Sequence, residues 1–443
     1  MKRFVQYVCL LVFVAFGFGT QAQVATSVNP SGFGDRQFAM DTVYSNKRIR
    51  EDDKMYQISV WRRIDLREKY NLSLYGSGDN KSNGIVNHIY KAVVDENALE
   101  VEDEVDGATE ILVENQTHYT KEQIIENHNV FLESLRHRFL DEKRKEALRK
   151  FENLGFPTKK DEEYKYTNLK EITEKAYNFF PKENHNITKE QLDELHLGEE
   201  NFDWITFVNG KLHKELSKVS IENVEFLSFN YALNDEKHRE VFDMYFNTIA
   251  SKDSAFTNLN EAYCKYGFFL KVPKNVVIER PIHIFYISQN QEENTFYNTR
   301  NLLIVEEGAK VEIIESHHNF DNTYVLTNSV TEIFTYSNAK ADWHKLQNDN
   351  DTSYLIDSTF ARQEKDSLTT VNTFSFGGKL VRNNLDFIHN GSNINSFMNG
   401  ITIIGKDQLV DHHTAVHHNF PNCESYQNYK GIFDGKSHGV FNG

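Results

Sequence analysis

Two different spacings of apolar residues divide this chain, and the change falls near residue 267. Between residues 121 and 154, apolar side chains recur every three or four positions, and Arg and Glu fill the other faces. This spacing is typical of an amphipathic α-helix, which Gly155 and Pro157 are expected to end. From there to about residue 259, helical segments mix with short strands such as Trp204–Val208. The pattern therefore predicts a helical or α+β domain at 121–266.

Beyond residue 267, short β-forming runs follow one another, separated by turn residues and without helical segments between them. Several turn markers, among them Gly308 and Asn338, are spaced by about fourteen residues or a multiple of that number. This pattern excludes βαβ units and leaves an antiparallel sandwich or a β-solenoid. Ladders of Asn, Thr and Ser favour the solenoid, which is expected to be right-handed. The predicted strands are Phe268–Val272, Ile282–Ile287, Leu302–Val305, Val311–Ile314, Val330–Phe334, Leu368–Phe376, Asn399–Ile404 and Leu409–Val416.

Composition limits the classes of function open to this chain. Its 443 residues are 39% hydrophobic and 13% aromatic, enough for packed cores in two or three domains. The formal net charge of −16 argues against nucleic acid or an anionic membrane as the main partner. The three cysteines, Cys9, Cys264 and Cys423, are too widely spaced for a CxxC pair or a disulfide framework. Cys264 stands among aromatic residues and is expected to be a small buried hydrophobe.

The amino terminus has the features of an exported protein. Lys2 and Arg3 precede a short apolar run, and small residues occupy positions −3 and −1 of a cleavage site after Ala22. Residues 1–22 are therefore expected to be a signal peptide, which implies export to the periplasm. The apolar run is too short for a good membrane span, and no other segment of the sequence resembles one.

Histidines near the carboxyl end are the most obvious candidates for metal chemistry. His412 and His413 stand on the predicted strand Leu409–Val416, His417 and His418 continue it directly, and Cys423 follows at a turn. Because alternate residues of a strand point to opposite faces, His413 and His417 share one face and the five side chains cannot all reach one ion. The candidate metal ligands are His413, His417 and Cys423, which could bind zinc or iron transiently. The favoured alternative is that these histidines form a polar ladder or a partner interface.

No catalytic residues are predicted from the sequence. It contains no GxxxxGK[ST], no GxGxxG after a strand, no GxSxG and no HExxH motif. Asp411 is the one carboxylate near the histidines that could orient an imidazole. Because β-helices also occur in carbohydrate-cleaving enzymes, such an enzyme stays open as an alternative. The pattern favours a non-enzymatic protein that holds no cofactor firmly.

A series of ordered motifs runs from residue 155 to the end of the sequence. It includes GFPTKKDEEYKYTNL (155–169), KVPKNVVIERPIHIFY (271–286), NLLIVEEGAKVEIIESH (301–317) and TFSFGGKLVRNNLDF (373–387). The segment DHHTAVHHNFPNCESYQNYKGIFDGKSHGVFNG (411–443) completes the series. Together these motifs resemble the SufD family, a component of the SufBCD complex for iron–sulfur cluster assembly, and the resemblance covers about 121–443.

The resemblance implies a helical N-terminal domain (121–266) and a right-handed parallel β-helix (267–443), followed in the family by a C-terminal helical domain. That last domain is not found in this sequence, and the turn at Asn442-Gly443 predicts a β-helix that is incomplete at its C-terminal end. The family is implied to be a cytoplasmic scaffold that pairs with SufB and is driven by the ATPase SufC. SufC is engaged through the missing domain, so its binding is expected to be lost.

The same resemblance bears on cofactors. In SufD relatives, the Cys and His implicated in cluster chemistry lie in a motif resembling DDVKCSHG, and no segment of this sequence matches it. Iron or an iron–sulfur cluster is therefore expected only in the assembled complex.

Residues 23–101 carry a different resemblance. The segment DDKMYQISVWRRIDLREKYNLSLYGSGDNKSNGIVNHIYKAVVDENALEV (52–101) resembles the front part of GldN, a periplasmic component of gliding motility and type IX secretion. Residues 102–120 are acidic, carry no apolar face and are interpreted as a linker. An exported fragment joined to a cytoplasmic scaffold predicts a chimeric chain. The alternative function is a GldN-like secretion component with the SufD-like part as a passenger.

Overall fold

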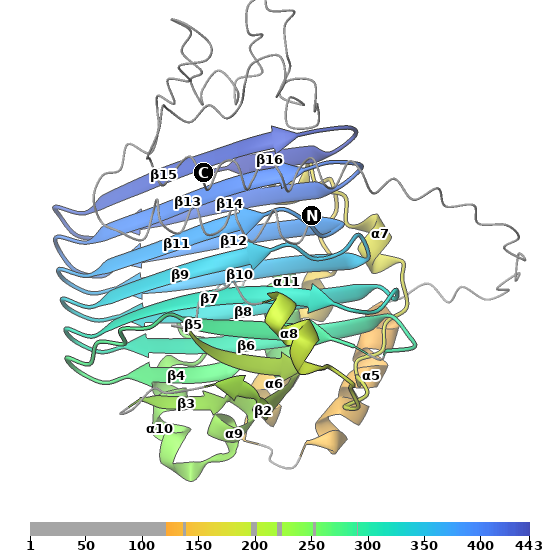
Figure 1. Ribbon diagram of the computed structural model, residues 1–443, viewed down its shortest axis with the longest axis horizontal. Coiled ribbons are helices and arrows are strands. Elements are labelled where there is room, and N and C mark those ends of the chain that lie inside the picture. The colour runs from red at the N-terminus through yellow and green to blue at the C-terminus, as the bar shows by residue number, and fades with distance from the viewer. Residues whose placement is uncertain (1–120, 136–138, 196–201, 219–223, 251–253, 290) are drawn as a thin grey trace, which may run out of the picture. The chain divides into compact units, whose positions relative to one another are not determined.

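A computed structural model describes residues 121–443, except 136–138, 196–201, 219–223, 251–253 and 290 (Figure 1). The predicted signal peptide (1–22), the GldN-like segment (23–101) and the acidic linker (102–120) all lie outside the described residues. Within the described part of the chain, no helix is both long enough and apolar enough to cross a membrane.

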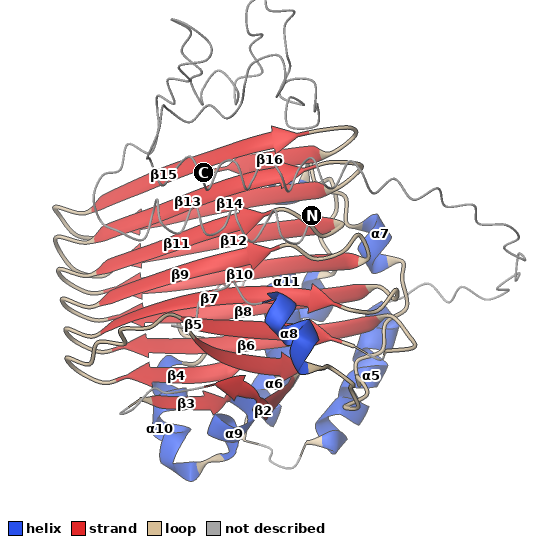
Figure 2. Ribbon diagram, in the orientation of Figure 1, coloured by secondary structure: helices blue, strands red, loops and turns tan. Residues whose placement is uncertain are grey.

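The strands of the described region form two eight-stranded sheets, with orders β15-β13-β11-β9-β7-β5-β1-β2 and β16-β14-β12-β10-β8-β6-β4-β3 (Figure 2). From β4 onward successive strands alternate between the sheets, so the chain coils through both. The strands are β1 (Asp203–Val208), β2 (Lys211–Lys218), β3 (Glu225–Ser228), β4 (Phe268–Val272), β5 (Ile282–Ser288), β6 (Thr295–Val305), β7 (Lys310–Asn319), β8 (Val325–Thr335), β9 (Lys340–Gln347), β10 (Ser353–Gln363), β11 (Leu368–Ser375), β12 (Leu380–His389), β13 (Asn395–Ile404), β14 (Leu409–His418), β15 (Glu424–Phe433) and β16 (His438–Asn442).

Parallel pairing decides between the two predicted architectures. β1–β2 and β3–β4 pair antiparallel, whereas β5 with β7, β7 with β9, and their counterparts in the other sheet pair parallel. An antiparallel sandwich is therefore excluded. The predicted fold class is confirmed as a helical region followed by a parallel β-solenoid of about six turns, β5–β6 through β15–β16 (Figure 1).

The regular spacing of turn residues in the sequence reflects the length of a solenoid turn. β9 pairs with β11 with Lys340 opposite Leu368, 28 residues further along the chain, which is twice the predicted interval of about fourteen. The turns that lead from an even-numbered strand to the next odd-numbered strand stack on one another, from β4–β5 to β14–β15. Each of these six turns contains a residue with a positive φ: Asn275, Gly308, Asn338, Asp366, Asn393 and Asn422. Asn, Asp and Gly tolerate this backbone conformation better than other residues do. The stacked turns also share backbone hydrogen bonds, as from the Asn338 amide to the Lys365 carbonyl (3.1 Å).

Apolar side chains fill the space between the two sheets. One column of facing residues on β5, β7, β9, β11 and β13 consists of Ile282, Ile313, Trp343, Val371 and Met398. Each of these side chains is at most 1% exposed. Burial of a large apolar side chain contributes about 1.5–3 kcal/mol, so each turn stabilises the turns on either side of it.

The helical region begins with two helices, α5 (Lys121–Ser134) and α6 (Asp141–Leu154), where the spacing of apolar residues predicted a single helical segment. The predicted glycine stop is confirmed: Gly155 has a φ of 69°, and its amide donates to the Phe151 carbonyl at 2.7 Å. The other helices are η4 (Glu162–Tyr164), α7 (Lys170–Thr173), α8 (Lys189–Leu195), α9 (Phe229–Asn234), η5 (Glu236–His238), α10 (Arg239–Tyr245) and α11 (Ala255–Tyr263).

α11 connects these helices to the solenoid. Phe256 and Leu259 on α11 are buried in the same apolar cluster as Phe151 on α6 and Ile356 on β10. Asn260 adds polar contacts, since its side-chain amide donates to the carbonyls of Thr299 (2.9 Å) and Asn328 (2.8 Å) on the sheet. A helix fixed by both apolar burial and backbone hydrogen bonds holds the two regions in one arrangement.

Candidate functional site

The histidine-rich strand is β14, and its alternation separates the four histidines as predicted. His412 points into the solenoid and is 5% exposed. Its Nε2 lies 3.1 Å from Thr402 Oγ1, and its Nδ1 lies 3.3 Å from the side-chain nitrogen of Asn383. Burial lowers the pKa of His412 to about 4, so this imidazole is neutral near neutral pH.

His413 lies on the opposite face of β14, between two carboxylates. Its Nε2 is 2.8 Å from Asp411 Oδ1, and its Nδ1 is 3.0 Å from Glu163 Oε2. The orienting role predicted for Asp411 matches this contact. Glu163, 250 residues earlier in the chain, had no counterpart in the sequence pattern. The His413 ring therefore lies between one carboxylate on β14 itself and one on η4.

Asp411 is the centre of a buried network around His413. Its Oδ2 accepts from Arg382 Nη1 and from Thr167 Oγ1, both at 2.5 Å. Burial alone would raise the pKa of Asp411, but the hydrogen bond with His413 and the charge of Arg382 outweigh it and lower that pKa. Arg382 also lies over the ring of Tyr164, 3.9 Å from its centroid. The network therefore fastens the segment around η4 to β12 and β14.

His417 and Cys423 have different neighbours. His417 Nε2 lies 3.1 Å from Asp386 Oδ1, and its side chain is 56% exposed. Cys423 Sγ donates to the Gly391 carbonyl at 3.2 Å. Thus, within the described residues, the three candidate ligands His413, His417 and Cys423 contact separate partners rather than one another. Their role as metal ligands stays a prediction.

His418 points to the same face as His412 but is the last residue of β14. Its Nε2 is 3.1 Å from Ser425 Oγ, and its ring packs edge-on against His389, with centroids 4.4 Å apart. His389 Nε2 is 2.7 Å from Ser396 Oγ. Burial lowers the pKa of His389 to about 4, and the nearby His418 adds to the shift. These contacts resemble the polar ladder weighed as the alternative to a metal site.

A second polar group lies inside the solenoid, among the apolar side chains that fill most of the space between the sheets. Glu315, Lys345 and Asp357 are each at most 2% exposed. Lys345 Nζ pairs with Asp357, while Glu315 accepts from Trp343 Nε1 at 3.0 Å and lies 2.9 Å from His317 Nε2. Burial raises the pKa of Asp357 in spite of Lys345. The sequence signal for this group is a set of charged residues at inward positions of otherwise apolar strands.

Cys264 behaves as the sequence predicted. It follows α11, is fully buried, and its carbonyl accepts from Arg144 Nη2 at 2.9 Å. Burial raises the pKa of its thiol, which keeps the group protonated and poorly nucleophilic. This cysteine packs the core and offers no reactive thiolate.

Comparison with known proteins agrees with this architecture. The family model described as the SufBD protein N-terminal region matches residues 114–284, and the one described as the SUF system FeS cluster assembly, SufBD core domain, matches residues 286–443. The first covers the helices and first strands, and the second covers most of the solenoid. The chain belongs to the SufBD family.

Several curated proteins are similar over the same region. An iron–sulfur cluster assembly SufBD family protein of Synechocystis is 25% identical over 299 residues, which are 66% of each chain. The iron–sulfur cluster assembly protein SufD of Escherichia coli is 26% identical over 292 residues, 65% of each chain. A SufBD family protein of Staphylococcus saprophyticus is 25% identical over 269 residues, 59% of this chain and 56% of the relative. The chain thus spans less than two thirds of the length of these relatives.

Proposed function

We propose that this protein is a SufD-like scaffold component of iron–sulfur cluster assembly that pairs with SufB and works with the ATPase SufC. The observation that carries the proposal is the tandem match of the two SufBD regions, in order, to residues 114–284 and 286–443. The similar proteins of Synechocystis and Escherichia coli are named for the same process, iron–sulfur cluster assembly. The role is structural, and the chain supplies no catalytic step of its own.

The shape of the solenoid suits such a role. Its turns are stacked by parallel pairing on two sheets, so each inner strand, such as β9 or β10, is held on both sides by strands about 28 residues away. The buried Asp411–Arg382 network fixes the segment around Glu163 against the face of β14 that carries His413 and His417. We propose that this side of the solenoid, the outer face of β12 and β14, is presented to SufB as a rigid surface, because rigid partners lose less entropy on association.

We further propose that iron or a cluster, as cargo, is held only when the complex is assembled. His413, His417 and Cys423 reach separate partners in this chain, and two imidazoles with one thiolate are a donor set that zinc and iron accept. A partner surface could supply the ligands needed to complete a site around one of these side chains. SufC is not expected to bind this chain by itself.

Complementation tests the proposed function. The full chain is expressed in the cytoplasm of a strain that lacks its own SufD, and the activity of an iron–sulfur enzyme is measured under iron limitation. Restored activity is expected, and failure of well-expressed, folded protein to restore it would contradict the proposal.

A variant separates scaffolding from metal binding. The combined replacement His413→Gln, His417→Gln and Cys423→Ser keeps polar side chains on the surface proposed to face SufB, so it should lower the iron content of the purified complex far more than it weakens pairing with SufB. Exposed His438 on β16 gives the matched control, His438→Gln, which should change neither quantity.

A further inference from the structure

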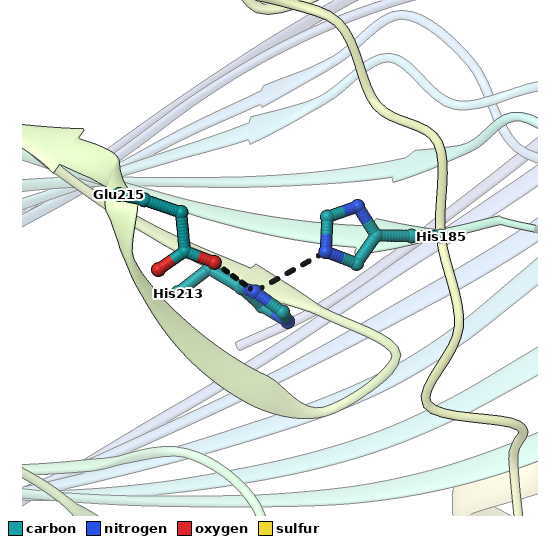
Figure 3. A group of neighbouring side chains, drawn as sticks. All are labelled: His185, His213 and Glu215. Carbon is teal, nitrogen blue, oxygen red and sulfur yellow. Dashed lines mark hydrogen bonds and ion pairs between the residues drawn. The ribbon is translucent and has the colours of Figure 1, made fainter.

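Three side chains of types that can bind a metal ion converge outside the histidine strand, at the edge of the first sheet (Figure 3). His213 and Glu215 lie on β2, two residues apart, so they share one face of that strand. His185 comes from the segment that precedes α8 and points toward them (Figure 3). None of the three was singled out by the sequence pattern, because 28 residues separate His185 from His213.

The distances suit a single ion. His185 Nε2 lies 3.2 Å from His213 Nδ1, and His213 Nδ1 lies 2.8 Å from Glu215 Oε1. One ligand atom from each residue lies within 4.8 Å of the other two. In a tetrahedral zinc site with Zn–N distances of about 2.0–2.1 Å, neighbouring ligand atoms are about 3.3 Å apart. The His185–His213 and His213–Glu215 separations are within about 0.5 Å of that value. The third, between His185 and Glu215, is at most 4.8 Å, and rotation of the exposed Glu215 side chain would shorten it.

A count of protons shows why these three atoms favour a cation between them. If the proton is on His213 Nδ1, that one N–H faces two acceptors, Glu215 Oε1 and His185 Nε2. If the proton is on His185 Nε2 instead, the lone pair of His213 Nδ1 faces a carboxylate oxygen at 2.8 Å. In both cases neutral imidazoles leave more lone pairs than donors. A divalent ion would accept all three lone pairs at once.

The far side of each ring provides no competing interaction. His185 Nδ1 and His213 Nε2 are buried atoms without a hydrogen-bond partner among the described residues. The polar contacts that the structure gives these two imidazoles therefore all lie on the side where the rings face each other, with ring centroids 4.3 Å apart.

The backbone around His185 is fixed on both sides of that residue. The Asn184 carbonyl accepts from Asn209 Nδ2 at 3.1 Å, and the Asn186 amide donates to Gln289 Oε1 at 2.9 Å. Lys211 and Glu183 add an ion pair of 2.9 Å between the same segment and β2. A site whose ligands are held before the ion arrives loses little conformational entropy on binding. Glu215, with a side chain 68% exposed, leaves the group accessible from solvent.

We propose that His185 Nε2, His213 Nδ1 and a Glu215 carboxylate oxygen bind a divalent first-row transition-metal ion, with water completing its coordination. Two imidazoles and one carboxylate form a donor set used for zinc and for non-haem iron(II). The site is independent of the role proposed above, since it shares no residue with β14 and needs no partner.

Metal titration of the full chain tests the site. Protein stripped with a chelator is titrated with Co²⁺, whose visible spectrum reports coordination, and bound Co²⁺ is then displaced with Zn²⁺. The wild-type protein should bind one tight equivalent through this site. His213→Gln and Glu215→Gln should each weaken that equivalent by at least about tenfold, since even residues outside the ligand shell change affinity by 10–100-fold.

Two controls make the outcome decisive. Glu215→Gln changes an exposed side chain, so circular dichroism and the thermal midpoint should match the wild type and any loss of metal is local. The combined His413, His417 and Cys423 variant should retain the tight equivalent. The proposed metal site would be contradicted if the wild-type protein binds no stoichiometric Co²⁺ or Zn²⁺. It would also be contradicted if Glu215→Gln and His213→Gln bind the ion as tightly as the wild type does.

Discussion

Arg300 on β6 and Glu332 on β8 form an ion pair of 2.5 Å, and both side chains are fully buried. Glu332 also accepts from the amides of Asn247 (2.8 Å) and Ile249 (3.2 Å), while Arg300 donates to Asn247 Oδ1 at 3.1 Å. The pair therefore joins two turns of the solenoid to the segment that follows α10. A buried charge left without its partner is costly, so this contact is a sensitive point of the fold.

Glu332→Gln should destabilise the protein by about 3–5 kcal/mol, because it leaves the Arg300 guanidinium buried and uncompensated. Urea unfolding followed by circular dichroism measures the change. The double variant Arg300→Met/Glu332→Gln should recover part of the loss, since no charge stays buried and the Gln oxygen can still accept from Asn247.

An exposed ion pair provides the control for that experiment. Lys274 and Glu307 lie 2.8 Å apart with side chains 56% and 52% exposed. Glu307→Gln should cost less than about 1 kcal/mol. Equal effects of Glu332→Gln and Glu307→Gln would contradict the importance given to the buried pair.

The column of left-handed turn residues predicts a second effect on stability. Asn338 has a φ of 58°, a conformation that costs a β-branched residue about 1–2 kcal/mol. Asn338→Val should lower the free energy of unfolding by about that amount, and Asn338→Gly should leave it nearly unchanged. Ser337→Val, at the adjacent position without a positive φ, is the control. Similar losses for both valine variants would show that the backbone conformation is not the cause.

His412 predicts a pH dependence. Its pKa in the folded protein is about 4, against 6.5 for an accessible imidazole. Between these values the unfolded chain binds a proton that the folded chain does not, so the free energy of unfolding falls as the pH decreases from about 6.5 to about 4. The lowered pKa of Asp411 acts at lower pH: its contribution is present above its unfolded pKa and is lost as the pH falls through its folded value.

Denaturant unfolding at several pH values between 7 and 4 isolates the contribution of His412. His412→Asn should reduce the slope of stability against pH by up to about 1.4 kcal/mol per pH unit, the value for one proton. Thr402→Val removes the hydroxyl 3.1 Å from His412 Nε2 but retains the titrating ring, so it should retain the slope. Identical slopes for the wild type and His412→Asn would disprove burial of a neutral imidazole.

The main features of the fold were predictable because they repeat. Turn residues such as Gly308 and Asn338 recur at the same position in successive solenoid turns, so their spacing in the sequence reveals the length of one turn. The glycine stop at Gly155 was equally clear, since its conformation is local. The break between α5 and α6 was not predicted, because apolar residues keep a spacing of three or four across it.

The candidate sites were only partly predictable, and the reason is long-range contact. Strand alternation alone placed His412 and His413 on opposite faces of β14. It could not bring Glu163 to His413, or His185 to His213, because no local pattern encodes a contact between distant segments. The charges of Glu315 and Lys345 inside the solenoid break the inward apolar pattern, and only their three-dimensional partners explain them.

Pairing with SufB tests the central claim most directly. The full chain is mixed with SufB from the same organism at micromolar concentration and analysed by size-exclusion chromatography with light scattering, with a full-length SufD as the positive control. A SufD-like scaffold should elute with SufB as a complex with one copy of each chain. Separate elution of the two proteins, under conditions in which the control SufD pairs with the same SufB, would contradict the proposed function.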